Sequence, residues 1–135
     1  MGDWFHFLFC YHAARRAFPN PERLVDSCIR MYDEKLMPDS FGKGQRFLDI
    51  DWAFTLNRAS VQSGYRLGES RERLLRFAED FIGYLSESPL FEKQYSDMHL
   101  MFGMICAVAE LQFALNGQIR TTRSLRQVLD RRPFI

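Results

Sequence analysis

The chain has 135 residues, of which 47% are hydrophobic and 26% charged, and its formal net charge is +1. This length predicts a single domain with a substantial core, and a charge so close to zero argues against binding to nucleic acid or to an anionic membrane surface. The sequence has no apolar run long enough for a membrane-spanning helix. Three scattered cysteines without a CxxC motif predict free thiols and a cytoplasmic location.

Six helical segments are predicted, and nearly apolar segments alternate with amphipathic ones along the chain. A segment that is apolar all round is buried on most sides, whereas a segment with one apolar stripe lies on a core as an outer helix. The predicted helices, buried and amphipathic in turn, cover residues 3–17, 21–36, 50–63, 70–85, 97–115 and 122–130. No strand-like alternation of useful length is present, so the fold is predicted to be all-α. Pairing the helices gives three stacked hairpins, at about 3–36, 50–85 and 97–130.

The three buried helices begin in a related way. Asp3, Asp51 and Asp97 each open one of them, at a spacing of about 47 residues. Tryptophan follows the first two acids, as Trp4 and Trp52. A fixed period in this range indicates stacked helical hairpins.

The long predicted loops, 37–49 and 86–96, both lead into the acidic ends of buried helices. Functional residues tend to lie on loops that a rigid scaffold holds, so this end is the predicted site. A carboxylate there could protonate a leaving oxygen or activate water, and Asp51 is the preferred catalytic residue, with Asp49 behind it. An aspartate in the first turn of a helix can equally serve as a cap for backbone N–H groups, which requires no function.

Several further residues are assigned to substrate binding, and most of them have a second interpretation. The tryptophans either stack on a ligand or pack in the core. Asn57 and Arg58 interrupt an apolar helix, and a buried arginine requires a partner. That partner is Asp97 or Glu110 within the chain, or a ligand carboxylate. The residues assigned to substrate binding are Asp3, Trp4, Trp52, Asn57, Arg58, Asp97 and His99.

Neither a metal nor a cofactor is predicted. His6 and Cys10 share a helix face, but a zinc site needs three or four ligands. The sequence contains no glycine-rich phosphate loop and no dinucleotide-binding fingerprint. The arginine-rich segment 120–132 is assigned to solvation and to pairing between helices.

The alternation of buried and outer helices, with long loops at one end, resembles the six-hairpin α/α toroid, whose members include unsaturated glucuronyl hydrolases and other glycosidases. The resemblance implies that acids near the inner-helix ends perform acid–base chemistry on a saccharide and that aromatic residues hold the sugar. It covers the whole chain at the level of pattern, and three hairpins correspond to half of such a toroid. The chain is then expected to be a C-terminal half, or to complete the toroid as a homodimer.

A second hypothesis is a non-enzymatic module of stacked hairpins that binds another protein. The first predicted helix is almost wholly apolar and carries no polar cap, which fits a neighbour supplied by a partner. The two hypotheses differ in whether Asp51 is needed for an activity.

Overall fold

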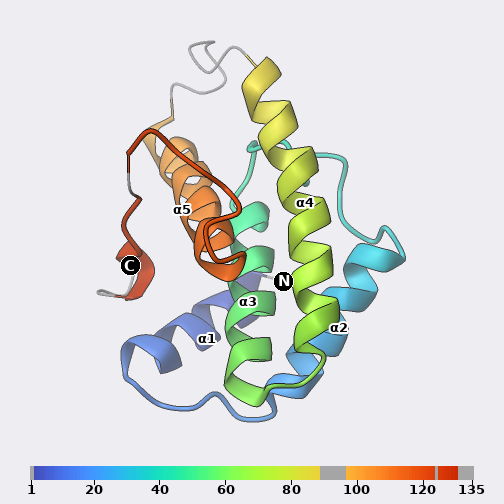
Figure 1. The fold of residues 1–135 in the computed structure, drawn as a ribbon. Helices are drawn as coiled ribbons and strands as arrows, with labels where there is room; N and C mark the ends of the chain where they lie inside the picture. The colour runs from blue at the N-terminus through green and yellow to red at the C-terminus, as the bar shows by residue number, and fades with distance from the viewer. Residues whose placement is uncertain (1, 89–96, 124, 131–135) are drawn as a thin grey trace.

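The structure is a computed structural model that describes residues 2–88, 97–123 and 125–130, with side chains from Phe5 onward. These residues form five α-helices and a short 3-10 helix, and they contain no strand (Figure 1). The α-helices are α1 (Gly2–Ala13), α2 (Pro21–Asp33), α3 (Leu48–Ser63), α4 (Leu67–Glu87) and α5 (Met98–Ala114), and the 3-10 helix is η2 (Val128–Asp130). The predicted all-α fold of packed helical hairpins is therefore confirmed.

Helix α3 is the centre of the fold. The other four α-helices all pack against it, and Figure 1 shows it enclosed by them. Every residue from Asp49 to Ser60 is buried, whether apolar or polar. A helix that is covered on all sides needs no polar face, which explains why this segment lacks an amphipathic stripe.

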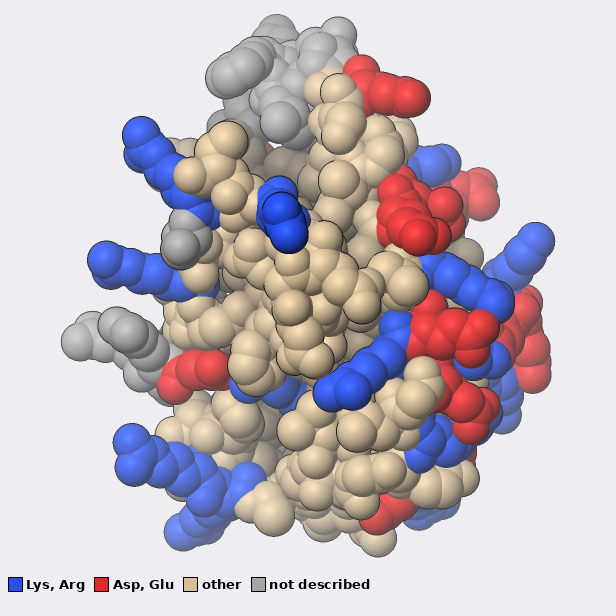
Figure 2. All heavy atoms as spheres, viewed as in Figure 1, with Lys and Arg blue, Asp and Glu red and all other residues tan. Residues whose placement is uncertain are grey.

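Helices α2 and α4 form an outer layer that packs on α3, and they also contact each other. Ion pairs join the two on the exposed side: Arg66, the N-cap residue of α4, pairs with Asp26 at 2.8 Å, and Arg73 of α4 pairs with Asp33 at 3.0 Å. Figure 2 shows blue and red side chains gathered along the margin that these helices form. Because each exposed pair contributes only about 0–1 kcal/mol, the buried apolar stripes provide most of the cohesion between the layers.

Two predicted helix ends lie further along the chain than the observed ones. Helix α1 ends at Ala13 instead of residue 17, and α2 ends at Asp33 instead of residue 36. Shortly after each end a residue takes a left-handed conformation, Arg15 with φ of 54° and Lys35 with φ of 53°. This conformation stops the helix and turns the chain toward the next element.

The described part of residues 122–130 contains only η2 instead of the predicted sixth helix, although Leu129 is buried. The described part of this segment runs back along α5. Gln127 donates a hydrogen bond from Nε2 to the carbonyl of Ala109 at 2.6 Å, and just before the segment Gln112 donates one from Nε2 to the carbonyl of Ile119 at 3.0 Å. Such hydrogen bonds from side chains to the backbone hold the chain in an irregular path. The segment also has too few apolar residues to form the apolar stripe of an amphipathic helix.

Within the described residues, no helix is both long and apolar enough to cross a membrane.

Candidate functional site

A cavity of about 270 Å³ lies where α1, the first turn of α3, the N-terminal half of α5, and η2 meet. We call it the Asp51 cavity. Most of its wall is apolar, and its polar groups are one carboxyl group, two imidazoles and one thiol. The described residues that line it are Phe5, His6, Phe47, Ile50, Asp51, His99, Phe102, Gly103, Cys106 and Leu129.

Asp51 is the acid of this cavity. Its side chain is 7% exposed, and no described residue donates a hydrogen bond to its carboxyl group. Burial raises the pKa of Asp51 from 3.8 to about 7, and the negative charge of Asp49 adds to this rise. Protonated and ionised forms of Asp51 therefore coexist near neutral pH, which is the condition that a general acid or base requires.

Asp49 does not reach the cavity. Its Oδ1 accepts a hydrogen bond from the backbone N–H of Gly42 at 2.6 Å, and its Oδ2 accepts one from the N–H of Gly44 at 3.0 Å. Both glycines have positive φ, 77° and 60°, which glycine adopts without strain. Burial raises the pKa of Asp49 to about 6, and the two N–H groups partly oppose that rise. The structure thus gives Asp49 the role of tying the loop before α3 to the helix, and not the predicted role beside Asp51.

Trp52 is a core residue. Its side chain is 0% exposed, and its Nε1 donates a hydrogen bond to the carbonyl of Cys28 at 3.0 Å. Its ring stacks on that of Tyr32, with centroids 5.0 Å apart. Successive side chains on a helix differ in direction by about 100°, so Trp52 points toward α2 while Asp51 points into the cavity. The predicted role of Trp52 in stacking on a substrate is wrong.

Asn57 and Arg58 are satisfied within the protein. Glu110, which is 1% exposed, accepts hydrogen bonds from Nδ2 of Asn57 at 2.6 Å and from Nε and Nη2 of Arg58 at 2.7 and 2.8 Å. Asp130 forms a further ion pair with Nη1 of Arg58 at 2.9 Å. Of the two internal partners considered for Arg58, Glu110 is the observed one. This network holds α3, α5 and η2 together, and it leaves neither Asn57 nor Arg58 in need of a ligand.

The first turn of α5 supplies a cap and a lining residue. Asp97 accepts a hydrogen bond from the backbone N–H of His99 at 2.8 Å, so it is the N-cap of α5. The ring of His99 packs on that of Phe47, with centroids 4.1 Å apart, and lines the Asp51 cavity. His99 is thus the one predicted binding residue that the described side chains bring to Asp51. The side chains of Asp3 and Trp4 lie outside the described part of the chain.

Sequence reasoning missed Phe47 as part of the cavity. A Cβ atom on Gly103 would lie 3.0 Å from the Phe47 ring. The glycine therefore lets this ring pack directly against α5, where it forms one wall of the cavity. A glycine inside an apolar helix is the signal that could have indicated such a close approach. Cys106 is also in the wall, but burial raises its pKa to about 11, so it is a neutral thiol and not a nucleophile.

No protein-family model, curated protein or solved structure matches the chain. The resemblance to the α/α toroid therefore stays a prediction, and function has to be argued from the cavities themselves. Among the described residues, no group of three or more His, Cys, Asp or Glu side chains is placed to hold a metal ion.

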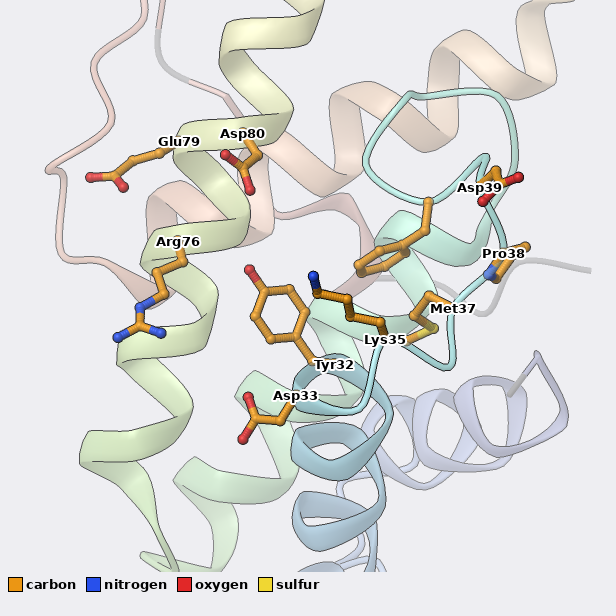
Figure 3. Close-up of a pocket in the computed structure, with 10 residues that line it drawn as sticks. Tyr32, Asp33, Lys35, Met37, Pro38, Asp39, Arg76, Glu79 and Asp80 are labelled. Carbon is orange, nitrogen blue, oxygen red and sulfur yellow. The ribbon is translucent and has the colours of Figure 1, made fainter.

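A larger cavity of about 620 Å³ lies between the C-terminal end of α2, the residues that follow it, and α4. Figure 3 shows Tyr32 standing in this cleft, with acidic and basic side chains around it. Burial and the nearby charge of Asp80 raise the pKa of Tyr32, and Asp33 is already paired with Arg73 at 3.0 Å. All the carboxyl groups that line the cleft, those of Asp33, Asp39, Glu79 and Asp80, belong to exposed residues. None is buried as Asp51 is, which makes the Asp51 cavity the stronger candidate for acid–base chemistry.

Proposed function

We propose that the Asp51 cavity binds a small, largely apolar ligand and that Asp51 exchanges a proton with it. The observation that carries this proposal is a single carboxyl group with a pKa of about 7 in a mostly apolar wall. An ionised carboxylate in such surroundings is costly unless it gains a partner. A ligand with an amino group would supply that partner, and its charge would favour the ionised form of Asp51.

The size and walls of the cavity define the ligand further. Ligand sites for drug-sized molecules usually enclose roughly 300–1,000 Å³, so about 270 Å³ suits a single ring with a short substituent. Phe5, Phe47 and Phe102 offer aromatic surface to that ring. His6 and His99 are exposed at the edge of the same cavity, where an imidazole can pass a proton between the site and water.

Glycoside hydrolysis, which the sequence predicts, is a more specific form of this function. Its general acid needs a raised pKa, which Asp51 has. It also needs a second carboxylate about 5–9.5 Å away. The described lining residues include no second carboxylate, and Asp49 is held by backbone amides. The geometry therefore favours proton exchange with a small apolar ligand over cleavage of a sugar chain.

Benzylamine and benzyl alcohol, a charged and a neutral probe of similar shape, test the proposal by calorimetric titration. Benzylamine should bind more tightly at pH 8 than at pH 6, because Asp51 is mostly ionised only above its pKa. Asp51→Asn should remove this pH dependence, while Asp97→Asn, a change at the exposed cap of α5, should retain it. Equal affinity of the parent and Asp51→Asn for benzylamine at pH 8 would refute the proposal. If the parent protein releases nitrophenol from nitrophenyl glycosides and Asp51→Asn does not, the result would instead support the hypothesis of a glycoside hydrolase.

A protein-binding module is the second candidate. A groove along α5 is lined only by apolar side chains, and Ile105 within it is 52% exposed. The face seen in Figure 2 carries a broad uncharged area between charged margins. A homodimer that covers this groove would have twice the 16.0 kDa mass of the chain, which light scattering can detect. A strictly monomeric parent protein would exclude self-association through this groove.

The proposed location is the cytoplasm. The cysteines Cys10, Cys28 and Cys106 are all free thiols, which agrees with a reducing compartment. A blocked or paired thiol in protein isolated from its own cells would contradict this location.

A further inference from the structure

A cavity of about 580 Å³ lies at the end of the bundle where α1, α3 and α5 all terminate, with η2 beside it. We call it the arginine cleft. Three arginines, one histidine and one aspartate line it, and apolar side chains from the three helices form much of the rest. It shares no lining residue with the Asp51 cavity. Figure 2 shows blue side chains at the lower left of the molecule, where Figure 1 places the linker that follows α1.

Arg15 and Arg16, in that linker, bring two positive charges to the cleft without a counterion. Both side chains line the cleft and are exposed, and neither forms a hydrogen bond or an ion pair with a described residue. Arginines that follow a helix often bond to the last carbonyl groups of that helix. These two do not, so their guanidinium groups are free to meet a ligand.

The backbone that carries the two arginines is held at both ends. The N–H groups of Arg15 and Arg16 donate hydrogen bonds to carbonyl groups in the last turn of α1, each at 2.9 Å. Beyond them, Gln62 of α3 bonds to both backbone groups of Phe18. Its Nε2 donates to the carbonyl at 2.8 Å, and its Oε1 accepts from the N–H at 2.9 Å. A loop fixed in this way loses little conformational entropy when a ligand binds.

The negative charge in the cleft is already paired. Asp130 is the one carboxylate among the described lining residues. Its Oδ1 lies 2.9 Å from Nη1 of Arg58 and 3.2 Å from Nε2 of His12. Arg58 is buried and is paired with Glu110 as well. The linker arginines therefore leave the cleft with an excess of positive charge, which favours an anion.

An apolar surface lies beside these charges. Phe113 of α5 and Val61 of α3 line the cleft, although they are 49% and 54% exposed. The guanidinium carbon of Arg58 lies 4.8 Å from the centroid of the Phe113 ring, and this contact holds the ring in place. Exposed apolar side chains next to unpaired arginines suit a ligand that carries both an apolar group and a negative charge.

We propose that the arginine cleft binds a phosphate monoester that carries a flat apolar group. Each guanidinium offers N–H donors in a planar fork that matches the oxygens of a phosphate. A phosphate monoester has three such oxygens and close to two negative charges at neutral pH, enough for Arg15 and Arg16 together, whereas a carboxylate brings one charge. The apolar group packs against Phe113 and Val61. This site is independent of the Asp51 cavity, and its ligand has the opposite charge.

Phenyl phosphate, phenyl sulfate and inorganic phosphate test the two parts of the proposal. Phenyl sulfate has the same ring with only one negative charge, and inorganic phosphate has the charge without the ring. Calorimetric or NMR titration of the parent protein at pH 8 should show phenyl phosphate binding roughly tenfold more tightly than either of the others.

Substitutions then assign the binding to the cleft. Arg15→Gln and Arg16→Gln should each weaken phenyl phosphate roughly tenfold, because each removes hydrogen bonds between charged groups. Arg71→Gln is the matched control, since it removes another exposed and unpaired arginine, on α4, that does not line the cleft. It should leave the affinity unchanged. Phe113→Ala should bring the affinity for phenyl phosphate close to that for inorganic phosphate.

Three outcomes would overturn the proposal. Phenyl phosphate fails to bind the parent protein at millimolar concentration, or it binds no more tightly than phenyl sulfate or inorganic phosphate. The third is that Arg71→Gln weakens it as much as Arg15→Gln does, which would indicate a general attraction of the surface for anions. Because the side chains of Arg15 and Arg16 are exposed and unbonded, their variants should fold as the parent does. Asp51→Asn separates the two sites, since its affinity for phenyl phosphate should equal that of the parent protein.

Discussion

Replacing Asp51 by asparagine should make the protein more stable at alkaline pH than the parent. The folded chain raises the pKa of Asp51 from 3.8 to about 7 because the side chain is buried. Between these two values the folded state binds a proton that the unfolded state has already lost, so stability falls as pH rises. Asparagine does not titrate, and its variant should show no such fall from this position.

The size of the effect follows from the two pKa values. A difference of one pKa unit corresponds to about 1.4 kcal/mol, so the fall from this residue is about 4 kcal/mol between pH 4 and pH 8. Asp49, with a pKa of about 6, also titrates in the lower part of the interval from pH 6 to pH 8, but it is present in both proteins and its contribution cancels in the difference between variant and parent. In this interval the loss of the Asp51 proton lowers stability by about 1.4 kcal/mol.

Urea unfolding followed by circular dichroism at several pH values measures this difference. The free energy of unfolding of Asp51→Asn minus that of the parent should increase by about 1.4 kcal/mol from pH 6 to pH 8. Asp97→Asn keeps the capping oxygen of an exposed residue and serves as the matched control. A difference between Asp51→Asn and the parent that stays constant over this range would show that burial does not raise the pKa of Asp51, and the proposed proton exchange would lose its basis.

The remaining predictions concern stability at neutral pH. Glu110→Ala should lower the free energy of unfolding by about 3–5 kcal/mol, because it leaves the charge of Arg58 buried with only Asp130, a partly exposed counterion. Replacing Arg58 and Glu110 together by Met and Leu should recover much of that loss. A loss below about 1 kcal/mol for Glu110→Ala would contradict the buried pair. Gly103→Ala should cost about 1 kcal/mol and weaken benzylamine binding, since its Cβ would lie 3.0 Å from the Phe47 ring. The matched change Gly83→Ala, on an exposed and open part of α4, should instead add about 0.5–1 kcal/mol, and equal effects of the two changes would argue against the close approach of Phe47.

The hydrophobic pattern predicted the fold well where burial is simple. The amphipathic stripes of α2 and α4 and the apolar run of α3 became outer and central helices. The pattern failed over the described part of residues 122–130, where a hydrogen bond from Gln127 to the carbonyl of Ala109 ties the chain to α5, and Gln112 of α5 bonds to the carbonyl of Ile119 just before it. Such bonds join residues whose proximity only the tertiary structure creates.

The site was predicted less completely, for two physical reasons. Asp51 was selected because it opens a nearly apolar helix at the end to which the long predicted loops lead. Trp52 was misassigned because one step along a helix turns the side chain toward a different neighbour. Asp49 was misassigned because its partners, Gly42 and Gly44, come from a loop whose course the sequence does not reveal.

The complete enclosure of α3 has a consequence for how the protein unfolds. In a linear array of repeats each unit touches only its neighbours, so an end can fray while the rest stays folded. Here four helices share one central helix, and the amides of Asp49 to Ser60 can reach water only when those helices separate. In hydrogen–deuterium exchange these amides should therefore be the slowest of the chain, and their exchange should report global unfolding. Loss of any one of the four surrounding α-helices would expose the helix on which the others rest.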